Sequence, residues 1–206
     1  MTLPASYVQF AVYETFAPTT LRAKVVLVAA ADEMWATGLP SVLAMECARI
    51  GAHLALAADT PVHSDIARDI VAYGRPVLEI VNTPASQIPG AATERYERVD
   101  VVVYVGSDTA LVEAACAVMA KQGTGCVVWI APEAAAEAVA DRVPALQAQL
   151  GMTGVRVNGI VAPLPDGPET GPSAQELAWQ AIFLASAGGA GIGGHCFHPV
   201  ATPARD

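Results

Sequence analysis

The sequence predicts an α/β fold: a Rossmann-like, doubly wound parallel sheet of about six or seven strands, with helices on both faces in three layers. Short β-branched apolar runs alternate along the chain with segments of helical periodicity, which is the pattern of repeated βαβ units. The clearest unit spans residues 24–59. There strand, loop, helix and strand end at Asp59, which is the outline of a dinucleotide-binding βαβ unit. No internal repeat or second core is visible, so we expect one domain over residues 1–206.

The expected strands are runs of apolar residues bounded by turn residues, as in strands buried on both faces of a parallel sheet. They cover residues 25–28, 54–58, 76–81, 99–105, 126–131, 155–161 and 195–197. The expected helices carry apolar residues at three- and four-residue spacing and stop near a glycine or a proline. They cover residues 43–50, 61–74, 108–121, 133–150 and 173–185.

Four segments are less regular. Residues 1–23 form an aromatic arm before the first strand, and residues 84–98 read as a polar, weakly helical linker broken by Pro89 and Gly90. Pro144 lies inside an Ala-rich helix, which predicts a kink or two shorter pieces. Residues 162–172 form a loop rich in Pro and Gly, and a capping box opens the helix that follows it.

Composition limits the classes of partner. The net charge is −9, and the 11 Lys and Arg residues are spread singly, so no basic patch for nucleic acid is expected. Only 15% of residues are charged and 53% are hydrophobic, which suggests that part of the surface is covered in an oligomer. No membrane-spanning run or secretory signal is visible. We therefore expect a cytoplasmic protein whose four cysteines are reduced and mostly buried.

Several stretches, in order, resemble the short-chain dehydrogenase/reductase (SDR) family. KVVLVAAA, AMECARIGA and LALAAD are similar to the family's first strand, helix and second strand, and DVVVYVG resembles its DVLVNNAG. AACAVMAKQGTGCVVWIAP resembles the helix and strand that follow, and GMTGVRVNGIVAP resembles GIRVNAIAPG. ELAWQAIFLASAGGAGIGG is similar to the family's last helix and turn. The resemblance covers residues 24–200 and implies a Rossmann-like fold and NAD(P)-dependent oxidoreduction.

The glycine-rich cofactor loop of the family is altered. Gly38, Leu39 and Pro40 stand where the family has GIG, and Asp32 and Glu33 fall near the expected phosphate position. Because close backbone approach needs glycine and carboxylates repel a phosphate, NAD(P) binding is expected to be lost.

Two further residues near this loop remain open to interpretation. Asp59 falls one place later than the family's ribose-binding acid, so we interpret it as a solvated acid at a strand end. Trp35 is expected either to fill the empty cofactor groove or to contact a partner.

The catalytic residues implied by the resemblance are also missing. Tyr104 and Val105 replace the NNAG asparagines before Gly106, and Pro132 replaces the active-site serine. All five tyrosines lie at or before Tyr104, and no lysine follows Lys121, so the YxxxK motif is absent from the second half. We predict no catalytic residue and a degenerate site. That site is lined by Asp32, Glu33, Gly38, Asp59, Tyr104 and Gly106.

Other candidate sites have simpler interpretations. His195 and His198 flank Cys196, but in a strand the two histidines point to opposite faces, so no metal site is expected. Ser107 and Asp108 follow the fourth expected strand, where a helix N-cap is the simpler interpretation.

The sequence keeps the family's fold pattern but lacks its glycine-rich cofactor loop and its catalytic residues. This combination suggests a non-catalytic SDR-fold subunit that pairs with an active SDR paralogue in a hetero-oligomeric oxidoreductase. An alcohol or hydroxyacyl-CoA dehydrogenase of aromatic degradation is an example of such an enzyme. The segments between Gly106 and Cys126 and between Pro132 and Val155 are short, and in the family they often build a four-helix dimer interface. Two alternatives stay open: an SDR-fold enzyme in which Asp32, Glu33 or Asp108 acts in new chemistry, and a homo-oligomeric small-molecule binding protein.

Overall fold

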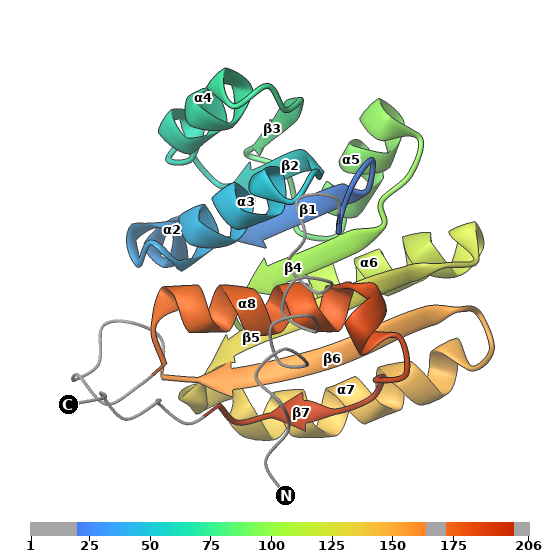
Figure 1. Cartoon of the computed structure of the whole chain (residues 1–206). Helices are drawn as coiled ribbons and strands as arrows, with labels where there is room; N and C mark the ends of the chain where they lie inside the picture. Colours follow the sequence, from blue (N-terminus) through green and yellow to red (C-terminus); the bar gives the residue numbers. More distant parts are fainter. Residues whose placement is uncertain (1–19, 164–171, 200–206) are drawn as a thin grey trace, which may run out of the picture.

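A computed structural model describes residues 20–163 and 172–199. Residues 1–19, 164–171 and 200–206, which include most of the expected arm and of the Pro-rich loop, lie outside the described residues (Figure 1). The described strands form one sheet of seven parallel strands in the order β3-β2-β1-β4-β5-β6-β7. This order reverses between β1 and β4, so the sheet is doubly wound as predicted.

The strands and helices alternate along the chain. The strands are β1 (Val25–Ala30), β2 (His53–Ala58), β3 (Val77–Val81), β4 (Val101–Val105), β5 (Gly125–Pro132), β6 (Val155–Ala162) and β7 (Cys196–Phe197). The α-helices are α2 (Asp32–Ala36), α3 (Leu39–Arg49), α4 (Ser64–Ala72), α5 (Ile88–Tyr96), α6 (Thr109–Gln122), α7 (Ala136–Leu150) and α8 (Ala174–Ala185). Short 3₁₀ turns lie at Glu133–Ala135 and Ala187–Gly189.

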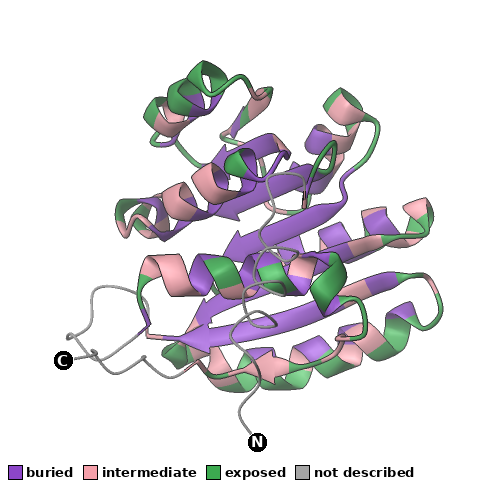
Figure 2. Ribbon diagram, in the orientation of Figure 1, coloured by how far each residue is buried: buried purple, intermediate pink, exposed green. Residues whose placement is uncertain are grey.

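The helices cover both faces of the sheet and bury its central strands. One core joins α2, α3, α4 and α8 to one face, and a second core joins α5, α6 and α7 to the other. Successive residues of β1 alternate between the two cores: Val26 and Val28 enter the first, and Leu27 and Ala29 enter the second. The central strands are therefore buried along nearly their whole length (Figure 2). This explains why their sequences are almost continuously apolar.

One sequence prediction about the helices was wrong, and another was wrong in one of its two alternatives. Residues 88–96 form helix α5 rather than a broken linker, because Pro89 lies in the first turn, where its missing N–H costs nothing. Pro144 does not divide the next long helix into two pieces, since α7 runs unbroken from Ala136 to Leu150 after a 3₁₀ turn, and the kink stays a prediction. The predicted capping box is confirmed, because the Ser173 side chain accepts from the N–H of Glu176 while the Glu176 side chain reaches back to Ser173.

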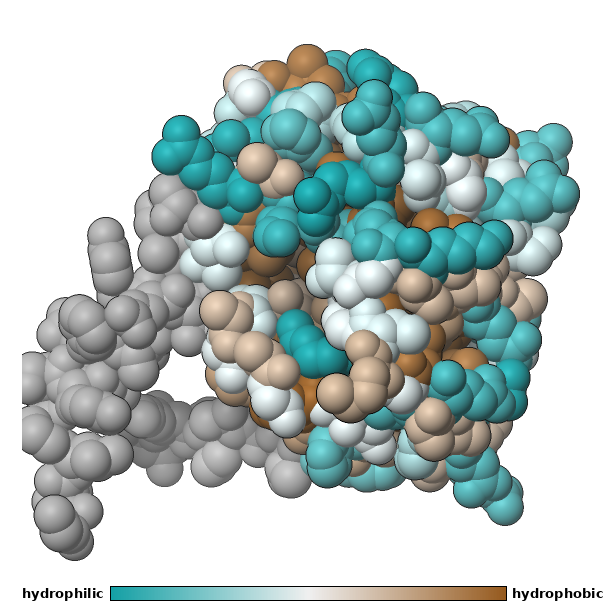
Figure 3. Space-filling view, turned by 90° about the vertical axis from the view of Figure 1, so that its right-hand side faces the viewer, coloured by the Kyte–Doolittle hydropathy of each residue, from teal (hydrophilic) through white to brown (hydrophobic). Residues whose placement is uncertain are grey.

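A buried carboxylate lies at the edge where the strands begin. Asp100 precedes β4 and is 6% exposed, and it accepts hydrogen bonds from the N–H of Val25 and from Lys24 and Arg98. It thereby ties the start of β4 to the start of β1. Figure 3 views the molecule from this side, where hydrophilic and hydrophobic residues are mixed on the surface. Among the described residues, no helix is both long and apolar enough to cross a membrane.

Candidate functional site

The carboxyl edge of the sheet, where α/β folds bind their ligands, is crossed by helix α2. The sequence predicted a loop here, but Asp32–Ala36 forms a short helix directly after β1. Asp32, at its start, accepts three hydrogen bonds from the turn after β2: from the N–H of Asp59 at 3.0 Å, the N–H of Thr60 at 3.1 Å and the Thr60 hydroxyl at 2.5 Å. The hydroxyl and N–H of Thr60 hold the pKa of Asp32 below its usual value. Asp32 thus links the ends of β1 and β2.

Trp35 lies buried beneath this link. Its side chain is 5% exposed, and its indole N–H donates to the carbonyl of Ala57 in β2 at 3.1 Å. The ring packs against His63, with 5.3 Å between the ring centroids. Trp35 is thus buried within its own fold at the β1–β2 edge, and that it fills the cofactor groove stays a prediction.

The amino end of α3 is a poor anion site. Gly38 has a φ of +80°, and no heavy atom lies within 4 Å of where a Cβ would stand, so glycine is needed here for backbone shape and not for close approach. The Leu39 N–H faces the Thr37 hydroxyl oxygen at 3.4 Å, and Pro40 has no N–H. The first turn of α3 therefore offers few free donors to a phosphate.

At the end of β4, Tyr104 folds back over Gly106. A Cβ at Gly106 would lie 2.6 Å from the Tyr104 hydroxyl oxygen, so only glycine fits beneath the ring. The hydroxyl oxygen accepts from the N–H of Asp108 at 3.1 Å, and the Trp129 indole N–H donates to the Gly106 carbonyl at 2.7 Å. Burial raises the pKa of Tyr104, and the carboxylates of Asp108, Glu33 and Asp59 raise it further. Tyr104 therefore stays neutral and has a structural role here.

The predicted site residues thus gather at the carboxyl edge of the sheet, where they interact with one another and with the turn after β2. Asp32 takes the donors after β2, while Glu33, Asp59 and Asp108 are exposed acids close enough to act on Tyr104. A dinucleotide needs free backbone donors and a positive environment for its pyrophosphate. The residues arranged here do not fit that group.

The interpretation of Asp108 as an N-cap is confirmed, because its side chain accepts from the Ala110 N–H at 2.8 Å at the start of α6. Near β7, the Cys196 Sγ lies 4.0 Å from His198 Nε2, while the ring of His195 faces Phe197, so the two histidines lie on opposite faces. No group of three or more His, Cys, Asp or Glu side chains placed to hold a metal ion occurs among the described residues.

The four cysteines are unpaired thiols. Burial raises the pKa of Cys47 and of Cys116 to about 12 each, and that of Cys126 to about 11. These thiols are therefore poor nucleophiles.

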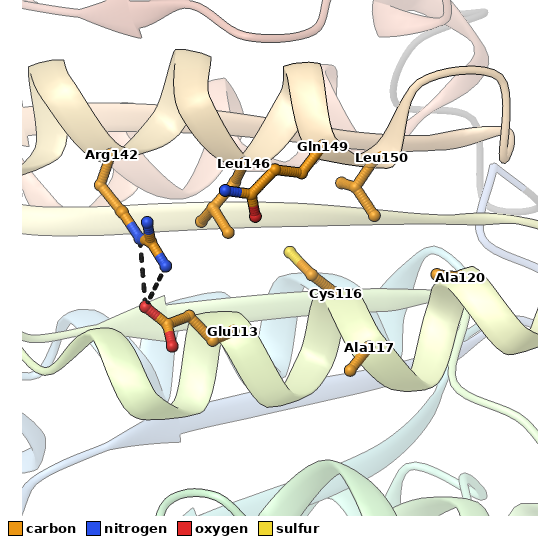
Figure 4. Close-up of a pocket in the computed structure, with 8 residues that line it drawn as sticks. All are labelled: Glu113, Cys116, Ala117, Ala120, Arg142, Leu146, Gln149 and Leu150. Atoms are coloured by element: carbon orange, nitrogen blue, oxygen red, sulfur yellow. Dashed lines mark hydrogen bonds and ion pairs between the residues drawn. The ribbon is translucent and has the colours of Figure 1, made fainter.

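A concavity of about 220 Å³ lies between α6 and α7, away from the carboxyl edge (Figure 4). Cys116 of α6 and Leu146 of α7 face each other across it, and Arg142 forms two hydrogen bonds with the Glu113 carboxylate at one end. Ala117 is exposed on the α6 side. The groove combines an apolar floor with a polar rim.

Many solved structures resemble this one. A short-chain type dehydrogenase/reductase from Mycobacterium marinum has a TM-score of 0.73 at 17% identity, covering 89% of this chain and 96% of its own. A hydroxysteroid dehydrogenase from Escherichia coli has a TM-score of 0.73 at 18% identity, covering 89% and 97%. A citronellol catabolism dehydrogenase from Pseudomonas aeruginosa has a TM-score of 0.75 at 17% identity, covering 89% and 95%.

The chain has the short-chain dehydrogenase/reductase fold. The sequence itself matches no protein-family model and no curated protein. The solved SDR structures above are named dehydrogenases, so the fold is that of an oxidoreductase family, as the resemblance in the sequence implied.

Within this SDR fold, the most specific motif match has a structural role. Asn158 of β6 is fully buried, and its side-chain amide donates to the carbonyl of Ile192 at 3.0 Å and accepts from the N–H of His195 at 3.3 Å. It holds the turn before β7 against β6. The motif GVRVNGIV is thus explained by packing and does not point to catalysis.

Sequence reasoning missed three residues of the carboxyl edge. Thr60 and His63 follow β2 without any motif, and Trp129 sits inside a strand that reads simply as apolar. The only available signal was an unexpected polar or hydrogen-bonding group next to a buried strand. The hydrogen-bond partners of Thr60 and Trp129, which are Asp32 and Gly106, lie 28 and 23 residues away.

Proposed function

We propose that this chain is a non-catalytic SDR-fold subunit that assembles with an active SDR paralogue in a hetero-oligomeric oxidoreductase. An alcohol or hydroxyacyl-CoA dehydrogenase of aromatic degradation is an example of such an enzyme. The observation that carries the proposal is the Asp32 carboxylate, which occupies the backbone donors of Asp59 and Thr60 at the nucleotide edge. A group that satisfies these donors from within the chain leaves NAD(P) without them.

The proton-transfer chemistry also points away from catalysis by this chain. Helix α7, which follows β5 where SDR enzymes place YxxxK, contains neither Tyr nor Lys. Tyr104 is buried with a raised pKa, and Asp32 is hydrogen-bonded with a lowered pKa. Neither group is suited to act as a general acid or base near neutral pH. The alternative of repurposed chemistry at Asp32 is therefore less well supported.

The α6–α7 groove supplies a surface for assembly. Cys116, Leu146 and Leu150 line it with apolar atoms, and Glu113 and Arg142 bond to each other at its rim. In SDR enzymes, the corresponding segments often build a four-helix dimer interface. We place the paralogue on this face, where its own α6–α7 pair would complete the bundle.

Coexpression with an SDR paralogue that keeps the glycine loop and YxxxK tests the proposal. The two chains should copurify with dehydrogenase activity that depends on the paralogue's tyrosine and not on Asp32. Ala117→Arg, in the groove, should abolish copurification. Ala72→Arg, at the equally exposed end of α4, should leave it unchanged. Turnover by the purified chain alone, lost on Asp32→Asn, would instead support a repurposed enzyme.

A further inference from the structure

We propose that His63 is a pH-sensitive latch that holds α2 on the β1–β2 edge at neutral pH and releases it in acid. This inference concerns the conformation of this chain and holds whether or not the chain is an enzyme subunit. It goes beyond the proposed function because it makes closure of the edge reversible.

The latch consists of two rings held by consecutive peptide units of β2. His63 is 1% exposed, and its Nε2 lies 3.0 Å from the carbonyl oxygen of Leu56. Trp35 donates to the next carbonyl, that of Ala57, and its ring packs against the imidazole at a tilt of 39°. His63 therefore supports the buried side chain that anchors α2.

The hydrogen bonding of His63 suits only its neutral form. A carbonyl oxygen can only accept, so Nε2 carries the proton that Leu56 receives. The other nitrogen, Nδ1, is buried, and no hydrogen-bond partner for it occurs among the described residues. In the neutral tautomer, Nδ1 has only a lone pair, but in the protonated form it would be an unsatisfied buried donor on a charged ring. Protonation therefore favours a state in which the ring reaches water, which requires the contact with Trp35 to open.

Neighbouring charges oppose this effect without cancelling it. Asp32 of α2 and Glu79 of β3 face His63 and favour its protonated form. Glu79 accepts from the Ser64 hydroxyl at 2.6 Å, and on His63's own helix the exposed Asp65 pairs with Arg68. Burial of the imidazole outweighs these carboxylates and lowers the pKa of His63.

The sign of the pH dependence follows. In the open form, His63 is expected to have its ordinary pKa of 6.5, whereas in the closed form the pKa is lower. The closed form therefore loses stability relative to the open form as the pH falls below 6.5 towards the closed-form pKa. One coupled proton changes the ratio of open to closed molecules by up to about tenfold per pH unit in that range.

Hydrogen-exchange mass spectrometry of the full chain at about pH 7.5 and about pH 5.5 tests the latch, after correction for the intrinsic pH dependence of exchange. In the wild type, the fraction of molecules whose α2 amides are exposed should increase several-fold at the lower pH, while the corrected exchange of peptides from α6 stays unchanged. His63→Gln keeps an N–H donor near the Nε2 position but cannot titrate, so its α2 exchange should show no such increase. His53→Gln is the matched control, because His53, the first residue of β2, likewise faces an aromatic ring, that of Tyr96.

A wild type without the increase, or His63→Gln with the full increase, would overturn the latch. If His63→Gln does not fold, an NMR titration of the wild type replaces it. The midpoint of the His63 ring signal should then fall below 6.5 and coincide with the change in the Trp35 indole signal. Separate midpoints would contradict the proposal.

Discussion

The Asp32 carboxylate accepts hydrogen bonds from both the backbone N–H and the side-chain hydroxyl of Thr60, at 3.1 and 2.5 Å. These two residues come from different βα turns of the same unit. Donors that an open Rossmann edge offers to a ligand are here satisfied within the chain. We propose that this closure, together with the altered glycine loop, keeps a dinucleotide from binding at the carboxyl edge.

Asp32→Asn is expected to lower the melting temperature at pH 7, because an amide is a weaker acceptor than a carboxylate for the three donors. The folded-state pKa of Asp32 lies below its ordinary value of 3.8, so its stabilising contribution is full above 3.8 and is lost as the pH falls through the folded-state pKa. Thermal melts over a pH series should therefore show the difference vanish in acid. Glu33→Gln, exposed on the same helix, should have little effect at any pH.

Trp35→Ala is expected to destabilise the fold by about 3 kcal/mol, because it removes a buried ring and leaves a cavity in its place. Trp35→Phe keeps most of the ring and loses the bond to Ala57, which is worth about 1 kcal/mol. Urea unfolding followed by circular dichroism measures both values. Tyr73→Ala, at a side chain that is 57% exposed, should change stability by less than about 0.5 kcal/mol.

Gly106→Ala is expected to destabilise the fold by about 2 kcal/mol, because its Cβ would overlap the Tyr104 ring at a backbone φ of +156°. Gly90→Ala provides the contrast. Gly90 lies inside α5, and no heavy atom lies within 4 Å of the position that an alanine Cβ would take, so alanine should stabilise by about 0.5 kcal/mol. Chemical denaturation measures the change in the free energy of unfolding of both variants, and the two changes should have opposite signs. A destabilised Gly90→Ala would contradict the packing described for α5.

Asp100→Ala is expected to destabilise by about 2 kcal/mol, since it leaves the buried N–H of Val25 without its partner and removes the acceptor shared by Lys24 and Arg98. Asp65→Ala removes an exposed ion pair with Arg68 and should cost less than about 0.5 kcal/mol. Equal effects in urea unfolding would show that the Asp100 cluster contributes no more than a surface pair.

The sheet could be predicted from sequence because its strands are buried on both faces and read as continuous apolar runs. Val101–Val105 is the clearest case, with every residue buried. Helix α5 was missed because Pro89 signals a break unless one knows that it falls in the first turn. Sequence patterns locate elements well but do not by themselves decide which side of a boundary a proline occupies.

The candidate site could be predicted only in part. The lost motifs and the acids Asp32 and Asp59 were visible in the sequence, but the bonds that connect them were not. The contact of Asp32 with Thr60 joins residues 28 positions apart, and the contact of Trp35 with Ala57 joins residues 22 apart. No local pattern encodes such pairs, since they arise from the crossing of two βα turns.

Titration of the purified chain with NAD⁺, NADH, NADP⁺ and NADPH by isothermal calorimetry tests the central claim most directly. An SDR enzyme with an intact glycine loop serves as the positive control. The account predicts no saturable binding of any of the four dinucleotides to this chain at concentrations that saturate the control. Tight binding by the lone chain would contradict it.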